Sequence, residues 1–138
     1  MTNTALVVDK HMKLIIWTMP RLAAFPKDQR FFLADRIQSI MLDVLELLVE
    51  AVYSKEKVPA LTKANLQLEK MRLLMRIAAD MKYISLKRYD YFCRSVLEIG
   101  KMIGGWKKFA GNQSPGVQGC QERGGRQGEV QVQAPSGP

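Results

Sequence analysis

Residues 86–109, LKRYDYFCRSVLEIGKMIGGWKKF, decide the fold class of this chain. Large apolar side chains recur three and four positions apart through the stretch, which places them on one face of a helix. A face of this kind is typical of the seam along which the helices of a bundle pack. Ser85 precedes the stretch and is expected to cap its first turn. The seam consists of Tyr89, Phe92, Val96, Ile99, Ile103 and Trp106.

Two further strong helices are expected over residues 29–53 and 60–81, with Asp28 as the N-cap of the first. The first of them has an apolar stripe and an opposite acidic face, and the second has a narrower seam of small and flexible side chains. The stripe is Leu33, Ile37, Ile40, Met41, Val44, Leu48 and Ala51, the acidic face is Asp35, Ser39, Asp43, Glu46 and Glu50, and the seam is Ala64, Leu68, Met71, Met75 and Ala78.

A fourth helix is expected over residues 9–25, with Pro20 kinking or breaking it near Ile16–Trp17. His11 is interpreted as a lone surface histidine. Trp17 falls off the expected seam, so it either anchors a protein interface or is buried by the change of direction at Pro20. The expected core positions are Val8, Met12, Ile15, Met19 and Leu22.

Helices of about 20 residues are about 30 Å long, and the links between them are short, so neighbours should be antiparallel. Residues 1–110 are therefore predicted to form an all-α, antiparallel up-down-up-down four-helix bundle. Residues 111–138 hold seven of the ten glycines, three of the six prolines and no aromatic residue. This Gly/Gln/Pro-rich segment is predicted to be a disordered tail, because it has too little apolar surface to offset the entropy of ordering.

The net charge of +8 is confined to one part of the chain. Residues 111–138 sum to zero, and residues 1–56 carry seven basic and seven acidic side chains. Residues 57–110 carry twelve basic and four acidic side chains, which accounts for the whole excess. One side of the bundle should therefore be electropositive and suited to an anionic partner such as nucleic acid.

Lys87, Arg94, Lys101 and Lys108 are spaced seven apart on the last helix and line one face over about 30 Å. A line of cations of this length suits a phosphate backbone. The other interpretation of such a face is a solvated helix surface. The predicted binding residues for nucleic acid or a polymerase are Arg72, Arg76, Lys87, Arg88, Arg94, Lys101, Lys107 and Lys108.

Gly100, Gly104 and Gly105 interrupt this helix, which predicts either close helix approach, within or between subunits, or fraying from Gly104 onward. Cys93 is expected to be a small buried hydrophobe. No catalytic constellation, metal-ligand cluster or phosphate-binding glycine loop is recognisable, so we expect no enzyme, no cofactor and no metal. The start lacks a signal-peptide pattern, no apolar run suits a membrane span, and two cysteines form no disulfide framework, which together favour a cytoplasmic protein without a membrane partner.

Three segments resemble one superfamily of small four-helix-bundle proteins: FPKDQRFFLADRIQ (25–38), MKYISLKRYDYF (81–92) and EIGKMIGGWKK (98–108). The superfamily comprises proteins encoded in intervening sequences of bacterial 23S ribosomal RNA genes and the accessory variability determinant (Avd) of diversity-generating retroelements. The resemblance covers residues from about 10 to 108, and the basic charge favours the retroelement branch.

The resemblance implies a homopentameric barrel with a positive surface and no catalytic activity of its own. It also implies association with the reverse transcriptase of the retroelement and with RNA or cDNA during mutagenic cDNA synthesis. Arg30, Phe31 and Trp106 match the motifs and are assigned to structure. The alternative function is an oligomeric interaction module of the intervening-sequence type that recognises an acidic protein or ribosomal RNA.

Overall fold

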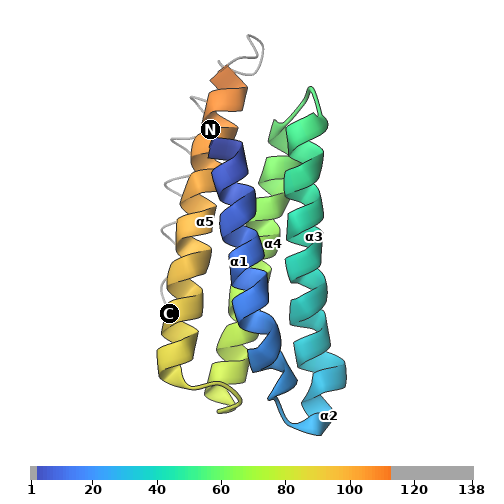
Figure 1. Ribbon diagram of the computed structural model, residues 1–138, viewed down its shortest axis with the longest axis vertical. Coiled ribbons are helices and arrows are strands. Elements are labelled where there is room, and N and C mark those ends of the chain that lie inside the picture. The colour runs from blue at the N-terminus through green and yellow to red at the C-terminus, as the bar shows by residue number, and fades with distance from the viewer. Residues whose placement is uncertain (1–2, 113–138) are drawn as a thin grey trace, which may run out of the picture.

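The computed structural model describes residues 3–112, in which four long helices pack antiparallel around one apolar core (Figure 1). The long helices are α1 (Asn3–Ala23), α3 (Asp35–Tyr53), α4 (Val58–Asp80) and α5 (Leu86–Asn112). Helix α1 packs on α3 and α5, and α4 packs on the same two helices, so α3 and α5 lie diagonally opposite each other. The predicted all-α four-helix bundle is confirmed for these residues.

The predicted seams of α3, α4 and α5 form the centre of this core. Every predicted seam position of α4 is buried, as is every stripe position of α3 except the half-buried Leu33. On α5 the seam is buried from Phe92 to Trp106, and Tyr89 is half-buried. Long runs of apolar residues at helical spacing leave only one face to bury, which explains why these predictions were right.

Helix α1 packs in a different rotation from the predicted one. Met12 is 44 % exposed, and Val8 and Met19 are half-buried. The buried positions of this helix are Val7, His11, Leu14, Ile15, Thr18 and Leu22. Ile15 and Leu22 are therefore buried as predicted, and Val8 and Met19 pack against the edge of the core. The buried face is turned toward the side that also contains a histidine and a threonine, which periodicity of apolar residues alone did not indicate.

His11 is fully buried, which corrects its interpretation as a surface residue. Its Nε2 lies 2.9 Å from the carbonyl oxygen of Met41 and donates a hydrogen bond to it. No hydrogen-bond partner for Nδ1 lies among the described residues. Burial lowers the pKa of His11 below its usual value of 6.5, against the smaller opposite effect of the bond to Met41, so the neutral ring is favoured in the folded chain.

The free energy of unfolding is therefore expected to fall as the pH drops below 6.5, because the unfolded chain takes up a proton that folded His11 resists. The loss continues until the pH reaches the lowered pKa of the folded state, with a slope of at most about 1.4 kcal/mol per pH unit. Urea unfolding at several pH values between 7.5 and 5 measures this fall in the free energy of unfolding. His11→Gln keeps a donor for Met41 and should remove this part of the slope; equal slopes in both proteins would contradict the prediction.

Helix α1 continues through Pro20 to Ala23, so the predicted break is not present. The carbonyl that Pro20 leaves without a helical donor belongs to Ile16, whose side chain is 69 % exposed. Water can satisfy a carbonyl on the exposed side of a helix, and the helix therefore tolerates the proline there.

The expected helix over 29–53 is divided at its start. A short helix α2 (Lys27–Gln29) precedes one π-helical turn (Arg30–Ala34), which leads into α3. Pro26 occupies the N-cap position of α2 and no side chain caps it, so the predicted capping role of Asp28 was wrong. The π turn leaves Phe31 and Phe32 75 % and 72 % exposed.

The link between α4 and α5 ends one helix and caps the next. Tyr83 N–H donates to the carbonyl of Ala78 (2.8 Å), and Lys82 adopts a left-handed backbone with φ 64°. The Arg88 N–H donates to Ser85 Oγ at 3.2 Å, which confirms the predicted cap.

Helix α5 includes Gly111 and Asn112, so it neither frays at Gly104 nor ends at residue 110. The rest of the predicted disordered tail, residues 113–138, lies outside the described residues. None of the described helices combines the length and the apolar content that crossing a membrane requires.

Candidate nucleic-acid interface

The predicted basic line lies on the outer face of α5. Lys87, Arg94, Lys101 and Lys108 are all exposed, on the side of the helix opposite the buried seam. Arg88 is also exposed at the start of α5, and Lys107 is half-buried near its end. Lys87, Arg94, Lys101 and Lys108 therefore share one exposed surface about 30 Å long, whereas the helical period places Arg88 and Lys107 off this line, on opposite flanks of α5.

Three of the candidate arginines are paired with carboxylates of their own helix. Arg94 lies 3.0 Å from Asp90, and Arg76 lies 3.9 Å from Asp80. Arg72 is held by Glu69 through two contacts, one of which joins Nε to Oε1 at 3.2 Å. Exposed intrahelical pairs of this kind stabilise a helix by a few tenths of a kcal/mol. Within residues 3–112, no carboxylate pairs with Lys87, Arg88, Lys101, Lys107 or Lys108.

A shallow groove between α4 and α5 has one candidate cation from each helix in its lining. Its volume is about 310 Å³, and Arg72, Lys101 and Glu69 line it. The hydrogen bond that Arg72 donates to Glu69 raises the pKa of Arg72 above its usual value, so the guanidinium remains charged. Arg72 and Lys101 are thus brought together, whereas Lys107 and Lys108 lie near the far end of α5.

Small residues are not required where the helices meet in this groove. A Cβ at Gly100 would meet Asn65 Oδ1 at 3.6 Å, an ordinary contact, and Gly104 and Gly105 face open space. Close helix approach within the protomer is therefore not the reason for these glycines, and approach between subunits stays a prediction. Cys93 is half-buried rather than buried, and burial raises the pKa of its neighbour Tyr89.

The sequence analysis missed a cluster where α1 meets α5. The rings of Trp17 and Tyr91 lie 4.6 Å apart between centroids, and the guanidinium carbon of Arg21 lies 4.8 Å from the Trp17 centroid. Trp17 is half-buried, so it is neither a fully exposed anchor nor a core residue. The sequence signals for this cluster are the i, i+4 spacing of Trp17 and Arg21 and the position of Tyr91 among the basic residues that begin α5.

An apolar strip spans the exposed surface of α1 and α3, and the sequence analysis missed this as well. Trp17 and Lys10 mark the side of α1 that faces α5, and Asp43 and Glu50 mark the side of α3 that faces α4. By the helical period, the apolar strip lies on the other side of each helix, and none of its residues is charged. It consists of the exposed Met12 and Ile16 on α1 and Leu42, Val49 and Val52 on α3, with the half-buried Val8 and Leu45 at its inner edge.

The acidic face of α3 is exposed as predicted and borders α4. Asp43, Glu46 and Glu50 line a groove of about 380 Å³ with Lys63 and Lys70. The acidic side chains therefore have cations of the same protomer beside them.

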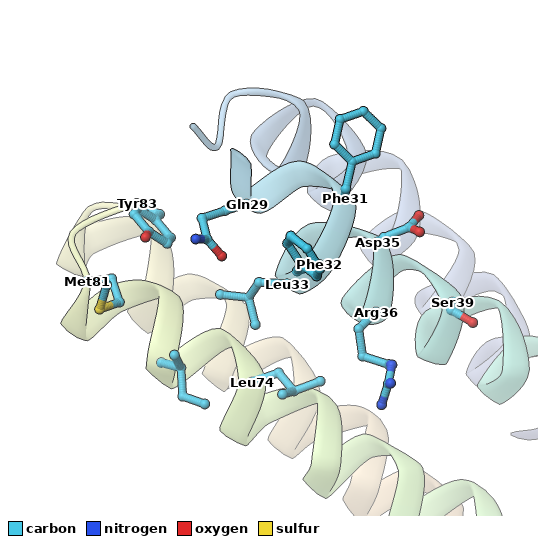
Figure 2. A pocket seen from close by; sticks show the side chains of 11 residues that line it. Gln29, Phe31, Phe32, Leu33, Asp35, Arg36, Ser39, Leu74, Met81 and Tyr83 are labelled. Atoms are coloured by element: carbon cyan, nitrogen blue, oxygen red, sulfur yellow. The ribbon is translucent and has the colours of Figure 1, made fainter. Parts of the chain in front are cut away.

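A pocket lies at the end of the bundle that holds α2. Figure 2 shows Leu33 and Leu74 on its floor, with Phe32 beside them and Phe31 pointing away. Its volume is about 630 Å³, and its charged lining residues are Asp35 and Arg36. The groove is mainly apolar, and its lining does not place a nucleophilic side chain next to a general base. No group of three or more metal-ligating side chains occurs in the described part of the chain.

The comparison with protein-family models agrees with this architecture. Residues 5–110, which include all four long helices up to the last turn of α5, match the model of the bAvd-like family. No curated protein gives a significant match. Because the family model covers most of the chain, the protein belongs to the bAvd-like family, a family of Avd-type accessory proteins.

Proposed function

We propose that this protein is the non-catalytic accessory subunit of a diversity-generating retroelement. In this role it binds RNA or cDNA and the reverse transcriptase of the element, in the cytoplasm, and supports mutagenic cDNA synthesis. The observation that carries the proposal is the exposed cation line of α5 on a bundle of the Avd-type family. Nothing in the mechanism requires a reacting group on the protein, because the polymerase performs the chemistry.

The α5 surface suits a flexible anionic chain better than a small ligand. Its cations follow a straight line about 30 Å long, and phosphates of an extended strand repeat along a similar line. No side-chain pattern on this surface is arranged to read base edges. Binding should therefore be sensitive to salt and nearly independent of sequence.

We further propose that the protein forms a homo-oligomer, a pentameric ring in the form that the resemblance implies. A ring requires two different surfaces on each copy. The apolar strip of α1 and α3 is the first of them, because an uncharged exposed surface on so charged a chain favours burial against protein. The second is the outer row of α4, whose exposed apolar residues are Leu66, Leu73 and Ile77.

The test of nucleic-acid binding is the double charge reversal Arg94→Glu and Lys101→Glu. Removing each phosphate contact lowers the salt slope of binding by about 0.7 for single strands and about 0.9 for duplex DNA. The reversal also adds repulsion, so affinity for labelled RNA at moderate salt should fall at least tenfold. Fluorescence anisotropy over a salt series measures both quantities, and co-purification measures retention of the reverse transcriptase.

The matched control is Arg36→Glu with Lys55→Glu, which changes the net charge equally on and beside α3, diagonally opposite α5. This variant should keep most of its affinity. If the α5 reversal folds and still binds RNA and polymerase like the unchanged protein, the proposed surface is wrong. Capture of an acidic protein that resists nuclease treatment, without any shift of nucleic acid, would instead favour the alternative interaction module.

A further inference from the structure

The cluster of Trp17, Arg21 and Tyr91 adds aromatic surface to the basic side of the bundle. Tyr91 is 46 % exposed and rests on the half-buried ring of Trp17. Its phenol is therefore held at a fixed tilt of 48° to the indole while part of its ring stays accessible. A supported, accessible ring loses little conformational entropy when a flat ligand stacks on it.

Tyr91 also lines a groove between α1 and α5 that offers room for such a ligand. The groove has a volume of about 380 Å³, and Leu14 and Met102 contribute apolar surface to it. Its two carboxylates already have cationic partners, since Glu98 lies 3.1 Å from Lys10 and Asp9 lies 3.3 Å from Lys13. An anionic ligand in this groove meets no unpaired carboxylate among the described residues.

Two unpaired cations lie one helical turn from the stacked rings. Lys87 lies one helical turn before Tyr91 on α5, and Arg21 lies one turn after Trp17 on α1. Neither forms an ion pair within the described residues, and the Nε atom of Arg21 is buried without a hydrogen-bond acceptor. Both cations lie toward the end of the bundle where α1 ends and α5 begins, so phosphates that adjoin a base on Tyr91 would meet them at that end (Figure 1).

We propose that this site holds an unpaired nucleobase of single-stranded nucleic acid, stacked on Tyr91, with adjoining phosphates on Arg21 and Lys87. The proposal rests on the nucleic-acid binding proposed above and specifies which form of nucleic acid the protein prefers. A paired base has both of its faces covered by stacking neighbours, so a duplex leaves Tyr91 unused. The α5 line then supplies affinity for either form, and the Tyr91 site supplies preference for the single strand.

The test compares fluorescein-labelled oligouridine, which has little structure of its own, with a duplex of oligoadenosine and oligouridine of the same length. Tyr91→Leu keeps apolar packing on Trp17 and removes the stacking ring. It should weaken oligouridine binding about tenfold, the effect expected for one stacked base, and change duplex binding less than twofold. Tyr91→Phe keeps the ring and should bind both probes like the unchanged protein.

Tyr53→Leu is the matched control, because Tyr53 is 86 % exposed at the end of α3, away from the basic surface. It should bind both probes normally. The proposal is overturned if Tyr91→Leu binds oligouridine normally, if it weakens duplex binding equally, or if Tyr91→Phe loses as much. It is also overturned if oligoglutamate displaces oligouridine at equal concentration, since the site then recognises acidic peptides.

Tryptophan fluorescence provides a second measurement, which does not depend on the folding of a variant. Trp106 is 5 % exposed in the core, whereas Trp17 packs against Tyr91 of the proposed site. Oligouridine should quench part of the emission and the duplex should not; quenching by neither probe would count against the site. If the unchanged protein binds neither probe, the proposed function itself is wrong. If it binds both probes through α5 but the Tyr91 substitution changes neither affinity, only the Tyr91 site is wrong.

Discussion

A chain that carries Ile16→Asp and Val49→Asp is expected to be a folded monomer. Both residues belong to the apolar strip and are 69 % and 43 % exposed, so aspartate at these positions can remain solvated in the single bundle. In an oligomer that covers the strip, the same carboxylates would be buried without partners, at a cost of several kcal/mol. Each 1.4 kcal/mol weakens association tenfold, so the effect on assembly should be close to complete.

Light scattering coupled to size-exclusion chromatography measures this change. The unchanged protein should elute as an oligomer, and the double variant should have the mass of one chain, 15.7 kDa. Leu86→Asp with Phe109→Asp makes the same chemical change at exposed positions of α5 and should leave the mass unchanged. A monomeric unchanged protein would contradict the ring, and an oligomeric double variant would contradict the assignment of the interface to this strip.

Replacing Phe92 by alanine is expected to destabilise the bundle by about 3–5 kcal/mol. Phe92 lies in the middle of the α5 seam and is the largest of the fully buried side chains in the described part of the chain. Its removal loses the transfer free energy of the ring and leaves a cavity in a core of closely packed side chains. For a domain of this size the whole stability is about 5–15 kcal/mol, so the variant should lose a large share of it.

Urea unfolding followed by circular dichroism measures this loss. Phe109→Ala is the matched control, since Phe109 lies on the same helix with 65 % exposure and should change the free energy of unfolding by less than about 0.5 kcal/mol. Equal effects of the two substitutions would mean that the packing of α5 differs from the arrangement described here.

Some features of the surface could not be predicted from charge counts. A count of charges does not show that Glu69, Asp80 and Asp90 each pair with one of the candidate arginines. Their spacings of three and four residues from these arginines are compatible with such pairs on a helix. The pair between Lys10 and Glu98, in contrast, joins two helices and depends on how α1 lies against α5.

The sequence by itself determined the bundle, the seams of α3, α4 and α5, and the cation line, because in each case one periodic row of side chains has a single matching face. It could not determine the rotation of α1, because periodicity of its apolar residues alone did not indicate the buried face. The tertiary structure decided that rotation by burying His11 and Thr18 on the inner face, and it thereby exposed Met12 and Ile16. The apolar strip and the stacking of Arg21, Trp17 and Tyr91 follow from this choice, since both depend on which side of α1 meets each neighbouring helix.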